Sequence, residues 1–387
     1  MKKIAIGQAG GPTSVVNSTL AGFVKETMDE FSLTFILNGY KGLVENNIIE
    51  GTEMFVKKVL QYEQVPGACL GSGRYPMTEE EIYNVLKNLK NQEIKILVFI
   101  GGDGTMEALH KIDFEAKRQR YDLQVLGLPK TVDNDIGLTD HAPGFGSAAR
   151  FIATATRNLS YDLYSMRNFE QVRVIETMGR NAGWLAAASG YFKKYEEDGP
   201  HYIALPEREI NKDVLLSNVT YAIQNYGYAV VVVSEGVKWR KGYQISKDVV
   251  HGREVLGGIS KEIQQFITKQ TNVKARAEVL GMTQRSFAQI VSNVDQKEAY
   301  LVGSVGGKWI KEEITNVMVS LQRSQVEFYN IQLKPVTLKD VALYGERLMP
   351  SYFIDNLSDY YTWLDPIIDD YASMYPRMIN NQNVFMK

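Results

Sequence analysis

Five short apolar runs recur along this chain, each followed by a turn rich in glycine or polar residues and in most cases by a stretch with helical periodicity. The runs are residues 3–7, 95–100, 124–127, 171–176 and 228–233. Because they are continuously apolar rather than alternating, we expect both faces of each strand to be buried, as in a parallel sheet flanked by helices. The sequence therefore predicts an α/β fold.

The polar motifs of the chain all follow the predicted strands directly. In open α/β sheets, ligands bind beyond the carboxyl ends of the strands, where the strand order changes direction. This placement predicts a functional site assembled from several loops.

Composition excludes several classes of protein. The 387 residues argue for two domains, and 43 basic against 45 acidic side chains give a net charge of −2, which disfavours nucleic acid or an anionic membrane as partner. No run approaches the roughly 18 apolar residues of a membrane span. The lone Cys69 cannot form an internal disulfide, and the four histidines lack zinc-ligand spacing. We therefore expect a cytoplasmic protein.

Residues 101–105, with the sequence GGDGT, are a candidate phosphate site. Glycines let the backbone approach a phosphate, and the amino end of the following helix attracts the anion. Asp103 would repel a phosphate, so it is interpreted as a Mg²⁺ ligand. The alternative is a structural turn in which Asp103 caps the helix. Gly10 and Gly11 form a weaker candidate of the same kind.

Residues 129–135, with the sequence PKTVDND, carry two carboxylates, Asp133 and Asp135, beside Lys130 and Thr131. Two aspartates separated by one residue in an extended segment point to the same side, where they bind a metal or share a proton. An aspartate beside a hydroxyl nucleophile can accept its proton. The alternative is a turn built by Asn and Asp side chains.

Arginines on loops punctuated by glycine are candidate phosphate ligands, because a guanidinium grips phosphate through two hydrogen bonds. They are Arg74, Arg180, Arg276 and Arg285. Glu207 and Glu235 either bind sugar hydroxyls or cap helices.

Taken together, GSGR, GGDGT, PKTVDND, MGRNAGW, SEG and the block 276–285 resemble the phosphofructokinases in order and spacing over residues 3–310. GGDGT alone also occurs in NAD kinases and lipid kinases. The resemblance implies two Rossmann-like lobes with a cleft between them. We place the donor and Mg²⁺ lobe at 1–143, completed by about 286–330, the sugar-phosphate lobe at 144–285, and a C-terminal helical extension at 331–387.

The implied reaction is phosphoryl transfer to the 1-hydroxyl of fructose 6-phosphate, a step of glycolysis, with Mg²⁺ as cofactor. By resemblance Asp133 is the base, Thr131 and Asp135 lie beside it, Arg180 stabilises the transition state, and Asp103 binds the metal. Donor-phosphate contacts are assigned to Gly11, Arg74, Gly102, Gly104, Thr105 and Lys130. Sugar contacts are assigned to Met178, Gly179, Glu207, Arg276 and Arg285.

Two positions bear on the identity of the phosphoryl donor, and they favour different donors. Lys130 resembles the pyrophosphate-dependent branch, but that branch has an aspartate at position 104, which would block the α-phosphate of ATP. Gly104 leaves room for a nucleotide, so we favour ATP over pyrophosphate. Met282 stands where many ATP-dependent enzymes have a histidine that contacts the sugar phosphate.

Two alternatives stay open. One is an NAD or lipid kinase, and the other is a non-catalytic subunit that binds sugar phosphates. We expect a homo-oligomer, a dimer or a tetramer, although the sequence leaves its order, its effectors and the use of sedoheptulose 7-phosphate undetermined.

Overall fold

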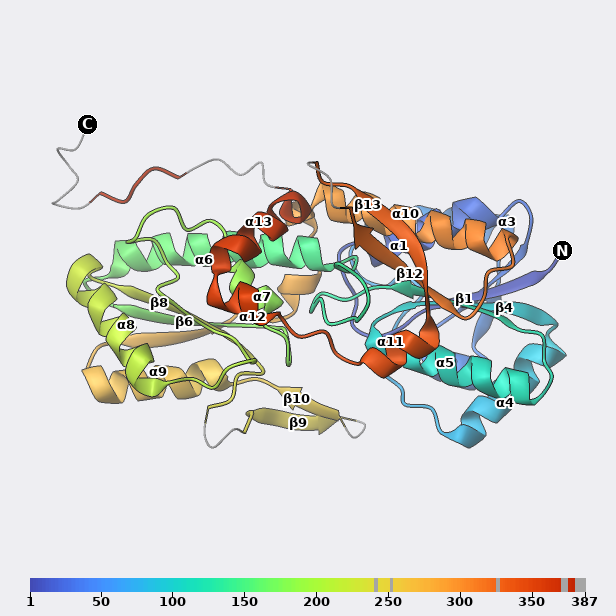
Figure 1. Cartoon of the computed structure of the whole chain (residues 1–387), viewed down its shortest axis with the longest axis horizontal. Helices are drawn as coiled ribbons and strands as arrows, with labels where there is room; N and C mark the ends of the chain where they lie inside the picture. Colours follow the sequence, from blue (N-terminus) through green and yellow to red (C-terminus); the bar gives the residue numbers. More distant parts are fainter. Residues whose placement is uncertain (240–242, 251–252, 325–327, 370–374, 380–387) are drawn as a thin grey trace.

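The structure is a computed structural model that describes residues 1–239, 243–250, 253–324, 328–369 and 375–379. It has two lobes side by side, each a sheet covered by helices on both faces (Figure 1). The predicted α/β fold with mainly parallel sheets is confirmed. Among the described residues, no helix combines the length and apolarity needed to cross a bilayer.

The first lobe contains a sheet of seven described strands. In spatial order they are β13 (Ile331–Thr337), β12 (Val317–Arg323), β5 (Gln124–Pro129), β4 (Ile94–Gly101), β1 (Lys3–Gln8), β2 (Ser32–Ile36) and β3 (Ile48–Glu50). The strands from β12 to β2 pair in parallel, and β13 and β3 close the two edges antiparallel. Strands that are neighbours in this sheet are therefore not always neighbours in sequence, because β12, from late in the chain, pairs with β5.

Helices cover both faces of this sheet (Figure 1). One face carries α1 (Val16–Thr27), α3 (Glu53–Leu60) and α10 (Asn293–Lys311), and the other carries α2 (Gly39–Val44), α4 (Glu79–Asn91), α5 (Asp103–Arg118) and α11 (Leu338–Tyr344). Helices α1 and α10 pack closely, because a Cβ on Gly22 would lie 2.1 Å from the Tyr300 carbonyl oxygen and one on Gly303 would lie 1.9 Å from that of Thr19. The late segment is therefore integral to the first lobe.

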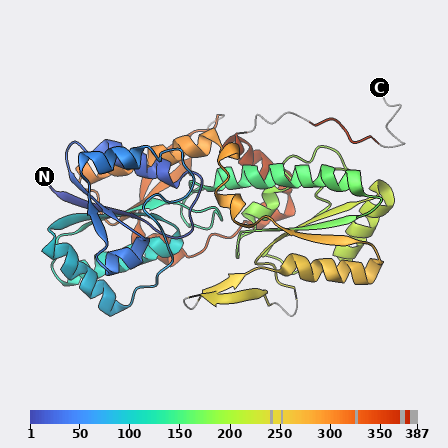
Figure 2. The same cartoon turned by 180° about the vertical axis from the view of Figure 1, so that it is seen from behind.

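The second lobe has a parallel sheet in the order β11 (Ala275–Val279), β6 (Val172–Thr177), β8 (Ala229–Ser234) and β7 (Tyr202–Ala204). Its helices are α6 (Phe145–Met166), α7 (Trp184–Ala188), α8 (Lys212–Tyr226) and α9 (Ile259–Thr271). The hairpin of β9 (Ser246–Val250) and β10 (Arg253–Leu256) projects from it beneath the junction of the lobes (Figure 2). Two short 3₁₀ helices, η1 (Gly281–Arg285) and η2 (Ala288–Ile290), lead the chain back toward the first lobe.

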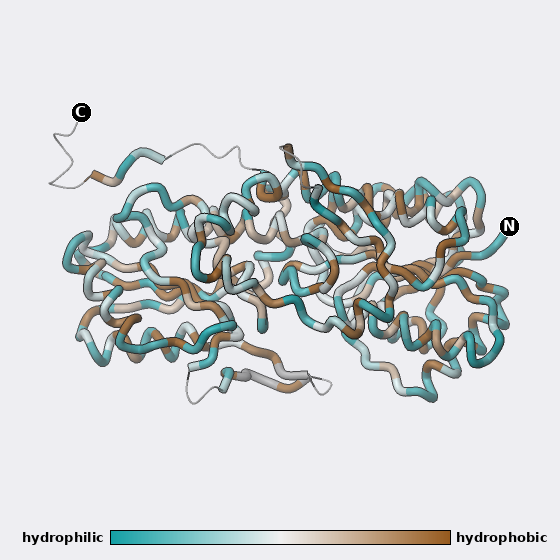
Figure 3. The backbone as a smooth tube through the Cα atoms, viewed as in Figure 1, coloured by the Kyte–Doolittle hydropathy of each residue, from teal (hydrophilic) through white to brown (hydrophobic). Residues whose placement is uncertain are grey.

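The C-terminal segment is divided between the lobes. Strand β13 and helix α11 complete the first lobe, whereas α12 (Ser351–Asp355) and α13 (Leu357–Ile368) pack on α6 and α7 of the second. The described part of the expected extension at 331–387 thus packs on both lobes, and it begins with an edge strand rather than a helix. Hydrophobic segments concentrate in the strands of both lobes, as the brown stretches of Figure 3 show.

Candidate active site

The motif loops follow the carboxyl ends of strands from both sheets and meet at the junction of the lobes. From the first lobe come residues 9–13 after β1, 102–105 after β4 and 130–136 after β5. From the second come 178–183 after β6, 235–236 after β8 and 280–285 after β11. The two sheets therefore present their ligand-binding edges to each other.

The loop after β5, residues 130–136, is held by its own hydrogen bonds. The Thr131 hydroxyl donates to Asp135 Oδ1 at 2.9 Å and accepts the Asp133 N–H at 3.1 Å. Asn134 has a left-handed backbone (φ 56°), which turns the chain between the two aspartates. The carboxylate of Asp135 and the backbone of Asp133 are thereby fixed, whereas the buried Asp133 Oδ1 has no hydrogen-bond partner among the described residues.

Asp133 has the electrostatics of a base that works near neutral pH. Burial, together with the carboxylates of Asp135 and Glu235, raises its pKa to about 7 against the opposing positive charges of Arg74 and Arg180. Burial also raises the pKa of Asp135, while the hydrogen bond from Thr131 lowers it. A base is most effective when its pKa lies near the operating pH.

Lys130 is a buried cation behind this loop. It is 3% exposed, and its ammonium group donates to the Gly11 carbonyl oxygen at 2.5 Å. Burial, together with the positive charge of Arg74, lowers its pKa to about 7. An anionic ligand at this point would restore the charge of the ammonium group.

The loop after β6 places Arg180 opposite residues 130–136, which we call the base loop. Gly179 (φ 134°) and Arg180 (φ 48°) both have positive φ, an unfavourable conformation for arginine that is typical of functional sites. The Glu235 carboxylate accepts the Arg180 backbone N–H, and a Cβ on Gly236 would lie 1.5 Å from the Arg180 carbonyl oxygen. The strained turn is thus held against the end of β8.

Arg285 reaches across from the second lobe. A Cβ on Gly11 would lie 3.0 Å from an Arg285 guanidinium nitrogen, so the glycine leaves room for this arginine. Burial lowers the pKa of Arg285, the charge of Arg74 lowers it further, and Asp133 and Glu235 oppose this. Arg74, Arg285 and Asp133 therefore lie within electrostatic reach of one another.

The loop after β4 faces open space at one position. Gly102 precedes the first residue of α5, Asp103, and a Cβ on Gly104 would meet nothing within 4 Å among the described residues. Thr105 is buried, and its carbonyl accepts the Tyr40 hydroxyl at 2.9 Å. Its side chain packs against Gly101, which makes it a structural part of the loop.

The donor set suits Mg²⁺ held partly by substrate. The described residues contain no group of three or more His, Cys, Asp or Glu side chains that could enclose a metal ion. Mg²⁺ commonly binds through one or two carboxylates together with substrate phosphates. Asp103, at the amino end of α5, with a buried carboxylate oxygen, fits such a role.

Two expected sugar ligands already have partners within the chain. Arg276 lies near the start of β11, about 10 Å of strand from its carboxyl end, and pairs with Glu170 at 3.0 Å. The structure therefore does not bring Arg276 to the cleft of its own chain. Glu207 Oε1 accepts the backbone N–H groups of Gly183 (2.8 Å) and Met349 (2.9 Å), so one oxygen is already used.

Other expected sugar contacts lie at the cleft. The Met178 N–H donates to the side-chain oxygen of Gln284 at 3.0 Å, which joins the loops after β6 and β11. Met282 is 60% exposed. Glu235 lies among the charged groups of the site, although the sequence favoured Glu207 over it. The signal was present, because Glu235 directly follows a buried strand.

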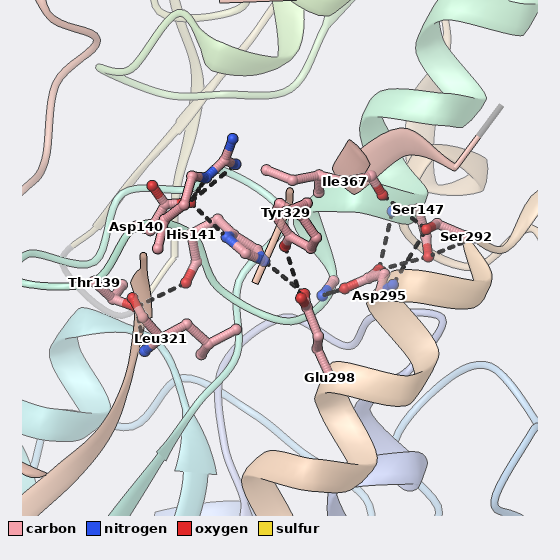
Figure 4. A network of polar contacts seen from close by, with 12 residues as sticks. Thr139, Asp140, His141, Ser147, Ser292, Asp295, Glu298, Leu321, Tyr329 and Ile367 are labelled. Atoms are coloured by element: carbon pink, nitrogen blue, oxygen red, sulfur yellow. Dashed lines mark hydrogen bonds and ion pairs between the residues drawn. The ribbon is translucent and has the colours of Figure 1, made fainter. Parts of the chain in front are cut away.

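A buried polar network fixes the chain just beyond the base loop (Figure 4). The two ring nitrogens of His141 contact Asp140 at 2.9 Å and Glu298 at 2.7 Å, and Tyr329 donates to Glu298 at 2.7 Å. Asp295 accepts the Gly144 N–H at 2.8 Å. Helix α10 is thereby joined to the segment that leads into α6.

Comparison with known proteins gives a consistent result. A family model described as Phosphofructokinase matches residues 3–304. The chain is 45% identical to a sulfofructose kinase of Alkalicoccus urumqiensis, covering 95% of this chain and 96% of that protein. It is 32% identical to a pyrophosphate–fructose 6-phosphate 1-phosphotransferase of Rhodospirillum rubrum, covering 95% and 94%.

Solved structures agree with this result. The crystal structure of a pyrophosphate-dependent phosphofructokinase from Nitrosospira multiformis superposes with a TM-score of 0.85 at 28% identity, over 98% of this chain and 94% of that one.

Proposed function

Because this chain belongs to the phosphofructokinase family, we propose that it phosphorylates the 1-hydroxyl of fructose 6-phosphate with ATP. The observation that carries this proposal is Asp133, a buried carboxylate with a pKa raised to about 7, which lies within electrostatic reach of Arg180 and Arg285. A base and two cations at the meeting point of two sheets are the components that phosphoryl transfer requires.

In the proposed reaction Asp133 accepts the proton of the 1-hydroxyl as the sugar oxygen bonds to the terminal phosphorus of the donor. The bond between that phosphorus and the bridging oxygen breaks, and ADP leaves with the electron pair. Arg180 stabilises the charge on the transferred group, while Thr131 and Asp135 keep the base in place. Mg²⁺ held by Asp103 would neutralise charge on the donor phosphates.

The donor assignment depends on Gly104 and Lys130. The open space beside Gly104 supports a nucleotide, because a side chain there would occupy the path of the α-phosphate. Lys130 is compatible with either donor, since its buried ammonium group can face any phosphate that approaches Gly11. Pyrophosphate, used by the Rhodospirillum rubrum relative according to its name, is the alternative donor.

A second acceptor is supported by the charges available in the cleft. Sulfofructose, named in the 45% identical relative, carries a sulfonate with one negative charge, whereas a phosphate monoester carries about −1.5 to −2 at pH 7. Met282 cannot donate a hydrogen bond, and Arg276 is paired with Glu170 outside the cleft. Without Arg276 and a histidine at position 282, one chain offers fewer cations to the acceptor's anionic group, which suits a sulfonate with one negative charge better than a phosphate.

A panel of two acceptors and two donors tests these proposals. We expect turnover of fructose 6-phosphate with ATP and Mg²⁺, and little with pyrophosphate. A kcat/KM that is higher for sulfofructose than for fructose 6-phosphate would establish the second acceptor. No phosphoryl transfer to either sugar from either donor would refute the proposed function, and exclusive use of pyrophosphate would refute the donor assignment.

A further inference from the structure

The segment between α11 and α12 crosses from the first lobe to the second at the edge of the site (Figure 1). We call residues 346–349 the strap. The family model matches residues 3–304, so the strap lies outside the matched region. Its contacts nevertheless reach two of the site loops and Glu207.

On the first lobe the strap is bonded to the base loop. The Arg347 backbone N–H donates to the Asp135 carbonyl oxygen at 2.8 Å. Ile136 and Glu346 form an isolated antiparallel bridge. The backbone immediately after the base is therefore paired with the strap, much as a short strand would be.

On the second lobe the strap contacts the loop of Arg180 and the carboxylate of Glu207. Glu346 Oε2 accepts the Asn181 side-chain N–H at 2.6 Å, and Glu207 Oε1 accepts the Met349 N–H at 2.9 Å. The Trp184 ring N–H donates to the Arg347 carbonyl oxygen at 3.3 Å, and the Arg347 guanidinium stacks 4.3 Å from the centre of that ring. The strap therefore joins both lobes at the point where they meet.

We propose that the strap is a third part of the active site, in which Glu346 is a positioning residue that holds the Arg180 loop against the base loop. This inference rests on the proposed function. Asn181 directly follows the strained Arg180, and its side-chain oxygen accepts a hydrogen bond from Gln244 at 2.9 Å. The side-chain amide of Asn181 is thus held by two hydrogen bonds, and removing Glu346 breaks one of them.

The charge of Glu346 also acts on the base. It raises the pKa of Asp135 as a smaller contribution beside burial, and Asp135 in turn raises that of Asp133. The other charged groups that face the two aspartates are the cations Lys130, Arg74, Arg180 and Arg285, which lower these pKa values, and Glu235, which raises that of Asp133. Removing the charge of Glu346 should therefore move the acidic limb of the rate profile to lower pH.

The hydrogen bond from Asn181 to Glu346 can be tested by exchanging its donor and its acceptor between the two positions. Glu346→Ala should lower kcat about tenfold, the effect of losing a hydrogen bond to a charged group. Asn181→Asp should lower it at least as much, because two carboxylates then face each other. In Asn181→Asp/Glu346→Gln the new amide donates to the new carboxylate, so kcat should return to within about threefold of the wild type. Glu346→Gln alone should shift the acidic limb of the pH–rate profile to lower pH.

The matched control is Asp359→Asn, which removes an exposed carboxylate from α13 away from the cleft and should change neither kcat nor the pH profile. Two results would overturn the proposal. One is wild-type kcat and pH profile in Glu346→Ala with an unchanged Tm. The other is a double variant no more active than Asn181→Asp.

Hydrogen exchange separates this inference from the proposed function. The amides of residues 131–137 and 347 should exchange faster in Glu346→Ala than in the wild type, whatever the protein phosphorylates. If the wild type transfers no phosphoryl group, the proposed function fails, whereas faster exchange in Glu346→Ala still supports the strap. Unchanged exchange at these amides would contradict it.

Discussion

Replacing Asp133 by serine tests the proposed base directly. Serine keeps a small polar group at the end of β5 but cannot hold the proton of the sugar hydroxyl at neutral pH. General-base catalysis contributes about 10²–10⁴-fold, so kcat should fall by that factor. Sugar KM should change little, because binding is assigned to other groups, among them Arg285.

The pH dependence of kcat/KM is a second, independent test of the role of Asp133. With a pKa raised to about 7 by burial and by neighbouring carboxylates, about 9% of Asp133 is ionised at pH 6 and about 91% at pH 8. Since only the carboxylate form accepts a proton, wild-type kcat/KM should rise about tenfold over this interval. In Asp133→Ser the rise should disappear.

The assay follows ADP release with fructose 6-phosphate, ATP and Mg²⁺ at constant ionic strength from pH 5.5 to 9. Asp29→Ser, which alters an exposed aspartate of the same lobe, serves as the matched control and should keep the wild-type profile. Near-normal turnover in Asp133→Ser, or a tenfold rise that persists in it, would refute the assignment of the base.

Three other predictions follow from single groups. Gly104→Asp should fold normally, because a Cβ there meets nothing within 4 Å, and should lose ATP-dependent turnover; retained use of ATP would contradict the steric argument. Lys130, whose pKa lies near 7 mainly because of burial, should contribute about 0.5 proton per site to the uptake when the donor binds at pH 7; calorimetry in buffers of different ionisation enthalpy should show this uptake, and Lys130→Met should reduce it by that amount. Burial alone would lower the pKa of His141, but Glu298 and Asp140 raise it to about 9. The charged ring therefore stabilises the fold fully below about pH 6.5, and this contribution fades as the pH rises through 9. His141→Gln should lower Tm more at pH 6 than at pH 10, and an equal loss at both would contradict this reasoning.

The base loop was the most predictable part of the site. Its residues lie next to one another in sequence directly after an apolar strand, so their proximity does not depend on tertiary folding. The two sheets were predictable for a similar reason, because continuous apolar runs indicate strands buried on both faces.

Arg276 shows where such reasoning fails. Arg276 is only a few residues from the cleft loop 280–285 in sequence. A strand extends about 3.3 Å per residue, however, so a residue at the start of β11 lies at the opposite edge of the sheet from that loop. The backbone contacts of the strap were not predictable. Arg347 and Met349 act through backbone N–H groups, which every residue except proline possesses, so no residue type marks them.

The placement of β12 between β5 and β13 has a consequence for synthesis on the ribosome. The sheet of the second lobe uses strands from residues 172 to 279 and can be completed once that stretch has emerged. The sheet of the first lobe, although it begins at residue 3, stays open at β5 until residues 317–337 are available. The nascent chain must therefore shield an unpaired apolar edge for about half of translation. Fragments that stop before β13 should consequently aggregate, and chaperone dependence during biogenesis should reside in the amino-terminal lobe.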